Sequence, residues 1–311
     1  MRYAVRHTTT YTYDAPVSDS LGVAHLVPRS LPWQQVTAYD VAVTPTAGDQ
    51  ASDRDYYGNH VTYYQVTEPH ESLEVEGSGE IDVVARTIAP AALATPWETL
   101  RPVVAPTTRG AWAVADLALP SALAAHAPGV ADYAAPSLTA RRPVGEAVAD
   151  LMHRVHADFD YDKTATTVTS QVADTLERRA GVCQDFAHLM LACLRSHGLA
   201  ARYVSGYLAT QPPPGKERIV GADASHAWVE VWLGHHDGAD QWIALDPTND
   251  QEVADRHVTV AWGRDYGDVP PVKGVIFTEA KRSTMRVSVD VAPLPPTAPS
   301  GPTTGPTTGP S

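Results

Sequence analysis

The feature that most constrains the fold is a cysteine placed at the start of a predicted helix, within Ala180–Leu191. Behind it, apolar side chains recur with helical spacing and share one face: Phe186, Leu189, Met190, Cys193 and Leu194. Such a face packs into a core and fixes the helix rigidly. Cys183 then lies where the unpaired backbone N–H groups of the first turn converge, and the partial positive charge there favours the thiolate. The sequence therefore predicts a rigidly held nucleophile that needs only a base.

Two later segments supply a base and a group to orient it. Ser225–Trp232 and Trp242–Pro247 have the composition of strands, and a short loop joins them, so we expect them to pair antiparallel. His226 is early in the first strand and Asp246 late in the second, which brings both to one end of the hairpin. The carboxylate of Asp246 would hold one ring nitrogen protonated and direct the other at the sulfur of Cys183. This is the order expected of a thiol nucleophile, its base and the base's orienter.

A single Cys, His and Asp triple is weak support in a chain with 13 histidines, so the hypothesis depends on the joint pattern. Gly181 precedes the cysteine, aromatic and acidic residues follow His226, and an Asp-Pro pair closes the second strand. A metal site at Cys183 and His226 would lack a third and fourth ligand at suitable spacing. The two cysteines, Cys183 and Cys193, stand roughly 15 Å apart along one helix, which is beyond disulfide reach. We therefore predict no metal and no cofactor.

Composition narrows the class of protein. The 311 residues, 43% of them hydrophobic, can build one large or two medium domains with a substantial core. A formal net charge of −13 argues against nucleic acid as a partner. There is no run of about eighteen apolar residues and no apolar signal-peptide core at the start, so we predict a cytoplasmic location and no membrane partner. Nothing indicates an oligomeric state.

The chain divides into four segments. Residues 1–90 alternate in strands at 2–13, 36–44, 61–66 and 71–84, with Asp14–Pro16 ending the first strand and a Gly58-Asn59 hairpin turn, which predicts an antiparallel β domain. Residues 91–140 are an Ala/Pro-rich helical connector. Residues 141–292 have helices followed by a meander of strands, including a last strand near 283–291, and are predicted to form an α+β catalytic core. Residues 293–311 are a Gly/Pro/Thr tail that we expect to be disordered.

Three blocks, Gly181–Phe186, Ser225–Glu230 and Leu245–Thr248, resemble the motif blocks of the transglutaminase-like superfamily in the same order. The opening β region is similar to the domain that precedes this core in bacterial members, and Gly263–Pro271 also looks typical of that group. The resemblance covers most of residues 1–290. It implies a papain-like core with Cys183 as nucleophile, His226 as base and Asp246 as orienter. It does not specify the reaction, because the superfamily includes cross-linking enzymes, peptidases, amidases and inactive members.

The expected chemistry is thiol acyl transfer on a peptide or protein substrate through a thioester. The backbone N–H of Cys183 would form part of an oxyanion hole, with Gln184 or Tyr161 as the side-chain donor. Trp228 and Trp242 either wall the acyl cleft or fill the core. We favour hydrolysis, by a peptidase or amidase, because the chain has no evident amine-binding motif or calcium loop. Transamidation and a catalytically idle binding module are the alternatives.

Overall fold

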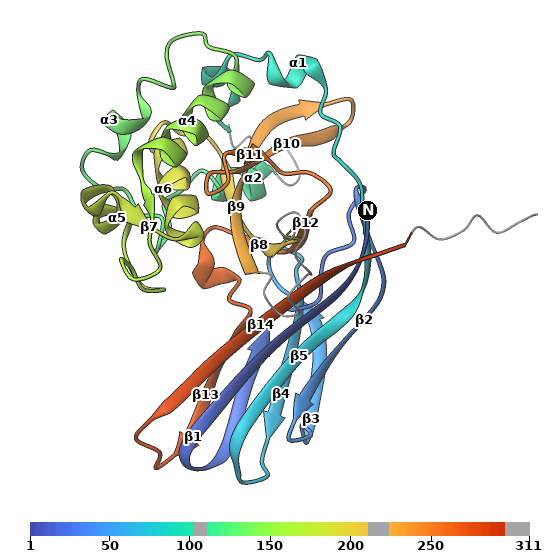
Figure 1. Ribbon diagram of the computed structural model, residues 1–311. Helices are drawn as coiled ribbons and strands as arrows, with labels where there is room; N and C mark the ends of the chain where they lie inside the picture. The colour runs from blue at the N-terminus through green and yellow to red at the C-terminus, as the bar shows by residue number, and fades with distance from the viewer. Residues whose placement is uncertain (103–110, 211–223, 296–311) are drawn as a thin grey trace, which may run out of the picture.

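The computed structural model describes residues 1–102, 111–210 and 224–295 and has two parts, a curled β-sheet and a mixed part of helices and strands (Figure 1). The predicted α+β class, with an antiparallel β domain preceding the core, is confirmed. Most of the expected tail, residues 296–311, lies outside the described residues, as do residues 103–110 of the connector. Within the described stretches, no helix is both long and apolar enough to cross a membrane.

The first part is a seven-stranded antiparallel sheet. Its strands are β1 (Arg2–Ala24), β2 (Gln34–Thr44), β3 (Asp49–Arg54), β4 (His60–Val66), β5 (His70–Val83), β13 (Val272–Thr278) and β14 (Ser283–Leu294). β1 extends beyond the predicted 2–13 and turns back near Asp14–Pro16 (Figure 1). Before that turn it lies between β5 and β14, and after it between β4 and β13. The sheet is therefore folded into two layers, whose facing apolar side chains include Val17, Val43, Tyr64 and Val75.

The last two strands correct the predicted domain boundaries. The sequence pattern predicts that the strand near 283–291 belongs to the catalytic core and that residues 293–311 form the tail. Instead β13 and β14 both pair with β1, and the pairing of β14 runs from Tyr13↔Ser283 to Arg2↔Leu294. Alternation identified the strand, but it carries no information about the strand's partner, so local pattern placed it with its neighbours in sequence. The two ends of the described chain thus meet in one sheet.

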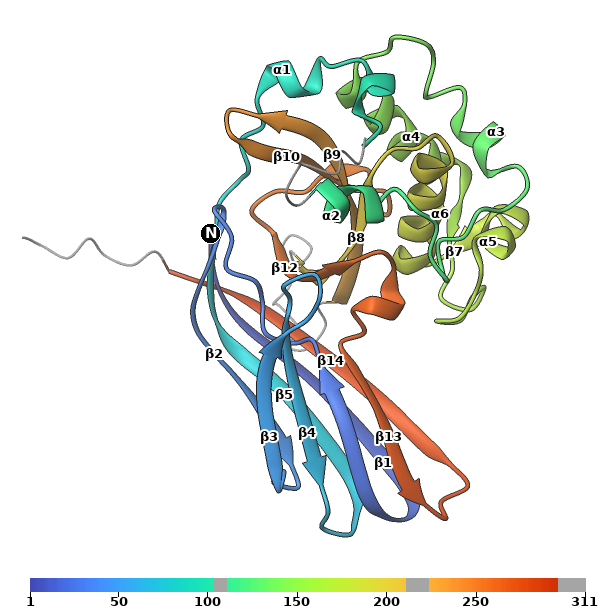
Figure 2. The same ribbon diagram turned by 180° about the vertical axis from the view of Figure 1, so that it is seen from behind.

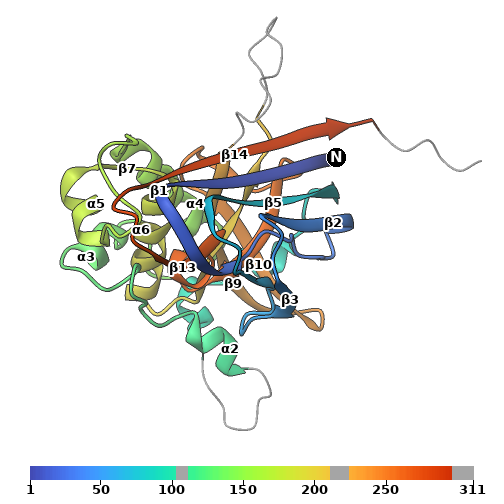
Figure 3. The ribbon, with the colours of Figure 1, turned by 90° about the horizontal axis from the view of Figure 1, so that it is seen from below.

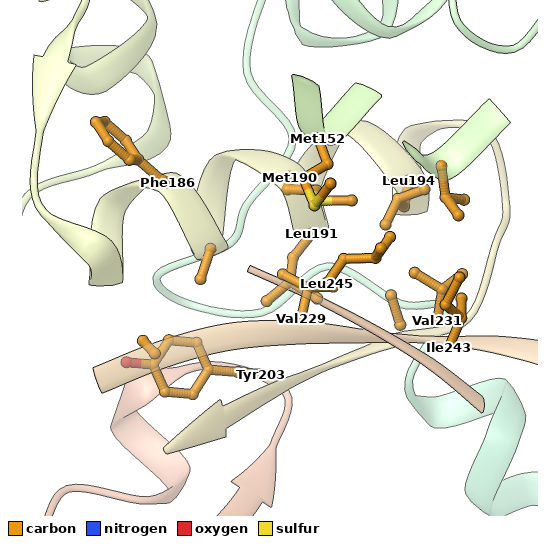
Figure 4. Packing of buried hydrophobic residues seen from close by; sticks show 14 of the residues in the cluster. Met152, Phe186, Met190, Leu191, Leu194, Tyr203, Val229, Val231, Ile243 and Leu245 are labelled. Atoms are coloured by element: carbon orange, nitrogen blue, oxygen red, sulfur yellow. The ribbon is translucent and has the colours of Figure 1, made fainter. Parts of the chain in front are cut away.

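The second part has a five-stranded antiparallel sheet in the order β11-β10-β9-β8-β12. Its strands are β8 (Ala201–Leu208), β9 (Ala224–His236), β10 (Ala239–Asp246), β11 (Gln251–Glu252) and β12 (His257–Gly263), followed by the short helix η2 (Tyr266–Asp268). The helices α4 (Val144–Asp158), α5 (Val172–Arg178) and α6 (Cys183–Ser196) lie together beside it (Figure 2). The short strands β6 (Asp160–Tyr161) and β7 (Ala180–Gly181) pair with each other. Between the helices and the five-stranded sheet lies the apolar core, where Met190 and Leu191 of α6 approach Val229 and Leu245 of the sheet (Figure 4).

Among the described residues, four short helices lie between the two parts in sequence. They are α1 (Pro90–Leu93), η1 (Trp97–Leu100), α2 (Ala111–Asp116) and α3 (Val130–Ala134). Trp97, Leu100 and Val130 are buried in the same apolar cluster as α6. The described part of this segment is therefore packed onto the core rather than suspended between domains.

A buried ion cluster joins the two parts on the side of the sheet away from α6. Glu230 of β9 is fully buried. It forms an ion pair with Arg86, which follows β5, at 2.5 Å, and accepts a hydrogen bond from Arg202 Nε of β8 at 2.7 Å. The Arg86 guanidinium also lies 4.0 Å from the ring of Trp33. Burial alone would raise the pKa of Glu230, but the two arginines outweigh it and lower that pKa. Trp242 stacks on Arg202 at 4.1 Å, which accounts for its position without a role in a cleft.

Candidate active site

The strand pairing of β9 with β10 brings His226 and Asp246 together. His226 Nε2 lies 2.7 Å from Asp246 Oδ2, and both side chains are buried. Cys183 is the first residue of α6 and is half-buried. It lines one pocket with His226, close enough for its sulfur to help raise the pKa of the imidazole. Because Nε2 is engaged by the carboxylate, Nδ1 is the nitrogen left for the sulfur. The three side chains that the sequence singled out therefore meet in space.

The charges of this group reinforce one another. Burial would lower the pKa of His226, but the hydrogen bonds to Asp246 and Cys183, with their negative charge, raise it to about 10. Burial would raise the pKa of Asp246, but the hydrogen bonds from His226, His257 and Asn249 hold it well below its usual range. At neutral pH, His226 is therefore an imidazolium held between an anionic carboxylate and the sulfur.

The start of α6 is fixed by a carboxylate cap. Asp185 Oδ2 accepts hydrogen bonds from the backbone N–H of Val182 at 2.8 Å and from Thr166 Oγ1 at 2.5 Å. A Cβ on Gly181 would come within 2.8 Å of this carboxylate, so only glycine leaves room for the cap. This explains the glycine before the cysteine in physical terms. The cap uses the N–H of Val182, while the first N–H groups inside a helix have no partner within it, and Cys183 and Gln184 occupy those positions.

The three accessory residues that the sequence proposed lie in different places. Gln184 adjoins Cys183 in the pocket and donates from Nε2 to the carbonyl of Val168 at 3.1 Å. Tyr161 is 52% exposed, packs edge-on against Phe186, and is not among the described residues that line the pocket. Trp228 is fully buried beside His226 with ring centroids 6.2 Å apart, so it fills the core rather than walling a cleft.

Sequence reasoning missed two partners of Asp246. Asn249 Nδ2 donates to Asp246 Oδ2 at 2.7 Å, in a turn where Asp246 Oδ1 also accepts the N–H of Thr248 at 3.0 Å. His257 Nε2 lies 3.3 Å from the same Oδ2, and its Nδ1 accepts the N–H of Ala254 at 3.4 Å. The proton of His257 is therefore on Nε2. The spacing Asp-x-x-Asn is a turn signal that could have indicated Asn249, whereas His257 lies on a strand whose place in the sheet no local pattern gives.

A pocket of about 240 Å³ opens above these residues, between the two parts of the molecule. One wall carries Cys183, Gln184 and His226, and the opposite wall belongs to the N-terminal sheet. The sheet residues that line it are His7, Thr9 and Tyr11 of β1, Val272 of β13, and Met285 and Val287 of β14. No Asp, Glu, Lys or Arg occurs among the described residues of the lining. A larger hollow of about 620 Å³, beside Tyr63 and Val275 of the same sheet, contains none of the three central side chains.

Within the described residues, one group of side chains has the spacing of metal ligands. The ligand atoms of His226, Asp246 and His257 all lie within 4.8 Å of one another. The same atoms are joined by the hydrogen bonds above, which account for their proximity without an ion.

Models of two known protein families match this chain, one in the N-terminal sheet and one in the part that contains the candidate site. The model of the bacterial transglutaminase-like N-terminal region matches residues 3–82, and that of the transglutaminase-like superfamily matches residues 131–247, which include Cys183, His226 and Asp246. The uncharacterised protein Rv2569c of Mycobacterium tuberculosis is 44% identical over 298 residues, covering 94% of this chain and 93% of that protein. A protein-glutamine gamma-glutamyltransferase of Pseudomonas aeruginosa is 36% identical over 105 residues, covering 32% of this chain and 15% of that protein.

The fold has a counterpart of known structure. The crystal structure of a candidate cysteine protease from Cytophaga hutchinsonii superimposes with a TM-score of 0.70 and 21% identity, over 96% of this chain and 92% of that one. At this identity the likeness shows the fold alone. The predicted fold, an N-terminal β domain followed by a papain-like core, is confirmed.

Proposed function

This chain belongs to the transglutaminase-like superfamily, and from that premise we propose that it is a cysteine-dependent acyl-transfer enzyme that hydrolyses amide bonds. The observation that carries the proposal is the series of contacts from half-buried Cys183 through His226 to buried Asp246. Burying a carboxylate and an imidazolium costs desolvation free energy, so packing alone does not explain this pair. The imidazolium that the carboxylate holds would, however, stabilise a nucleophilic thiolate.

In the proposed reaction the Cys183 thiolate attacks the amide carbonyl carbon and forms a C–S bond. The tetrahedral oxyanion collapses, the C–N bond breaks, and His226 Nδ1 gives its proton to the leaving amine, which leaves a thioester. Water then attacks the thioester and loses a proton to Nδ1, the C–S bond breaks, and the acid is released. Asp246 stays ionised throughout and stabilises the imidazolium.

We assign the oxyanion site to the backbone N–H of Cys183 and the side chain of Gln184. The first N–H of a helix has no partner within the helix, and Gln184 is the proposed donor that shares the pocket with the thiol. Its second Nε2 hydrogen remains available, because one bond is made to Val168. Tyr161 lies outside the described lining of this pocket but close enough to Cys183 for the sulfur to help raise the pKa of the phenol, so it is the alternative donor.

Transamidation is the second candidate, because a relative matching this part of the chain is named as a protein-glutamine gamma-glutamyltransferase. The two reactions share the thioester and differ in whether water or an amine resolves it. Mass spectrometry of a peptide library incubated with the protein, with and without a primary amine, distinguishes the hydrolysis products from the transamidation products. Hydrolysis is the proposal, so acid products that persist in the presence of amine are expected. The predicted cytoplasmic location stays a prediction.

The state of the thiol gives a direct test. At pH 6 we expect iodoacetamide to alkylate Cys183 about 10-fold faster in the wild type than in His226→Ala. The raised pKa of His226, about 10, keeps the imidazolium beside the sulfur at this pH. Without the imidazolium, an ordinary thiol of pKa about 8.5 is under roughly 1% ionised at this pH. The larger thiolate fraction of the wild type therefore speeds alkylation, and the lower nucleophilicity of a stabilised thiolate offsets only part of that gain. Rates are measured by peptide mass spectrometry.

The control for this test is internal. Cys193 is fully buried, and burial raises its pKa to about 12, so it should remain unlabelled in both proteins. Equal labelling rates of Cys183 in wild type and His226→Ala would contradict an activated thiol.

His257 should act as a positioning residue through Asp246. We expect His257→Phe to lower kcat/KM by about 10- to 100-fold, since hydrogen bonds to charged groups contribute about 1.5–3 kcal/mol. Loss of this donor leaves a more basic carboxylate that holds the His226 imidazolium more strongly, so the alkaline limb of the pH–rate profile, which reports His226, should move upward. His257→Gln, which retains a donor, should recover part of the rate. A profile of unchanged shape in His257→Phe would reduce the role of His257 to packing.

A further inference from the structure

We propose that the edge of β14 binds an extended, uncharged peptide segment of the substrate, which adds to the sheet as a strand along Ser283–Val287 and leads into the Cys183 pocket. The proposal rests on the acyl-transfer function above and specifies its substrate. It gives the N-terminal sheet, which carries none of the reacting groups, a direct part in substrate selection.

The edge itself is unusually regular. β14 pairs with β1 through twelve consecutive residues with no shift in register, and for Ser283–Val287 β1 is the only strand partner within the described parts of the chain. Figure 3 shows β14 as the outer strand beside β1. Natural proteins normally protect such edges with a bulge, a proline, charged side chains or a covering segment. Ser283–Val287 contains no proline and one charged residue, Arg286, and all five residues are exposed. Since they have no second strand partner among the described residues, their outer backbone groups can serve as a template for another strand.

This edge is continuous with the pocket. Successive side chains of a strand point to opposite faces, which places Met285 and Val287 on one face. Both residues line the Cys183 pocket, yet they are 62% and 43% exposed, so they border it rather than close it. A strand that adds beside them would carry alternate side chains toward the same pocket. The carbonyl that ends such a segment would then reach the thiol.

The lining of the pocket defines the chemistry of the segment. Apolar surface comes from Tyr11, Val168, Val272, Met285 and Val287, and the described lining contains no Asp, Glu, Lys or Arg, so its charged groups are the proposed thiolate and imidazolium of Cys183 and His226. A charged substrate side chain would lose its hydration there without gaining a partner. Small or branched apolar side chains at alternating positions are therefore the expected ligand.

Peptidyl chloromethyl ketones, which alkylate the thiol and carry only the acyl side of a substrate, test this directly. We expect acetyl-Val-Ala-Val-Ala-Gly-chloromethyl ketone to inactivate at least about 10-fold faster than acetyl-Gly-chloromethyl ketone, because two or three added backbone hydrogen bonds suffice for that factor. N-methylation at alternate residues of the longer probe should remove the gain, and methylation at the residues between should not. A rate that is independent of length and of methylation would overturn strand addition.

A pair of matched variants locates the surface. Met285→Glu should lower the ratio of the long-probe rate to the iodoacetamide rate by about 10-fold, since it places an unpaired charge beside the segment. Val275→Glu makes the same change at a 63% exposed valine on β13 of the same sheet, away from the Cys183 pocket, and should leave the ratio unchanged. Equal ratios in the two variants would contradict the assignment to β14.

A binding measurement separates this proposal from the catalytic one. Fluorescence anisotropy of fluorescein-labelled Val-Ala-Val-Ala-Gly with Cys183→Ala protein reports on the surface without any reaction. Binding that Met285→Glu weakens supports the β14 site even if Cys183 proves unreactive, in which case only the proposed function falls. No binding at millimolar peptide, with a thiol that iodoacetamide labels rapidly, overturns the β14 site and leaves the proposed function standing.

Discussion

Cys183→Ala protein should form no hydrolysis product above background, a loss of at least about 10⁴-fold in kcat, because residues that act together in covalent catalysis leave only residual activity when the nucleophile is removed. The thiol is the proposed attacking atom, and the other side chains of the pocket lining that carry a hydroxyl group are Thr9, Tyr11, Tyr203, Ser205, Ser225 and Tyr266. Among the described hydrogen bonds, none joins these hydroxyl groups to His226, whose neighbours are Asp246, Asn249 and Cys183. The measurement is product formation from the peptide library, by mass spectrometry.

The matched control is Cys193→Ala, which removes the same atom ten residues further along α6. Cys193 packs among apolar residues with its sulfur 3.7 Å from the carbonyl of Val130, so its loss should lower stability slightly and leave kcat within about 2-fold. Activity in Cys183→Ala above roughly 1% of wild type would identify a different nucleophile and refute the mechanism. Thermal unfolding of both variants confirms that each is folded.

Glu230→Ala should lower the free energy of unfolding by about 3–5 kcal/mol, the largest stability effect that we expect from a single substitution. Glu230 is fully buried between Arg86 and Arg202, and its removal leaves two guanidinium groups without their carboxylate. The effect comes from the uncompensated buried cations rather than from the loss of a favourable pair, since desolvation offsets much of the attraction between buried ions. Urea unfolding at neutral pH measures it.

Glu80→Ala provides the comparison, because Glu80 pairs with Arg2 at 2.6 Å on the surface, where ion pairs contribute about 0–1 kcal/mol. The pH dependence has a definite sign. The pKa of Glu230 is lowered in the folded state, so its contribution is present above the ordinary carboxyl pKa of about 4.3 and is lost as pH falls through the folded-state value. The difference between wild type and Glu230→Ala should therefore shrink in acid. Equal urea midpoints for Glu230→Ala and Glu80→Ala would contradict the buried cluster.

The sequence was sufficient to place Cys183, His226 and Asp246 because each depends on local order. A helix start is signalled by the residues around it, and a hairpin fixes which residues of two adjacent strands share an end. The structure brings these three together as that logic requires. Gln184 also follows from its neighbour in sequence, since the residue after a helix-start cysteine lies beside the same pocket.

The remainder of the site depends on contacts between distant segments, which periodicity does not encode. His257 reaches Asp246 because β12 lies at the end of the sheet beside β8, and nothing in its own alternation indicates that order. Met285 reaches the pocket because β14 pairs with the first strand of the chain rather than with its sequence neighbours. Sequence alone does not decide whether Trp228 and Trp242 lie in the cleft or the core, because contacts with other strands fix both: Trp228 is buried beside His257, and the partly buried Trp242 stacks on Arg202.

The position of β14 has a consequence for biosynthesis. The thiol, the imidazole and the carboxylate are all translated before Met285 and Val287, which complete the wall of their pocket. The pocket that holds these three side chains is therefore complete only after β14 has been synthesised and has paired with β1.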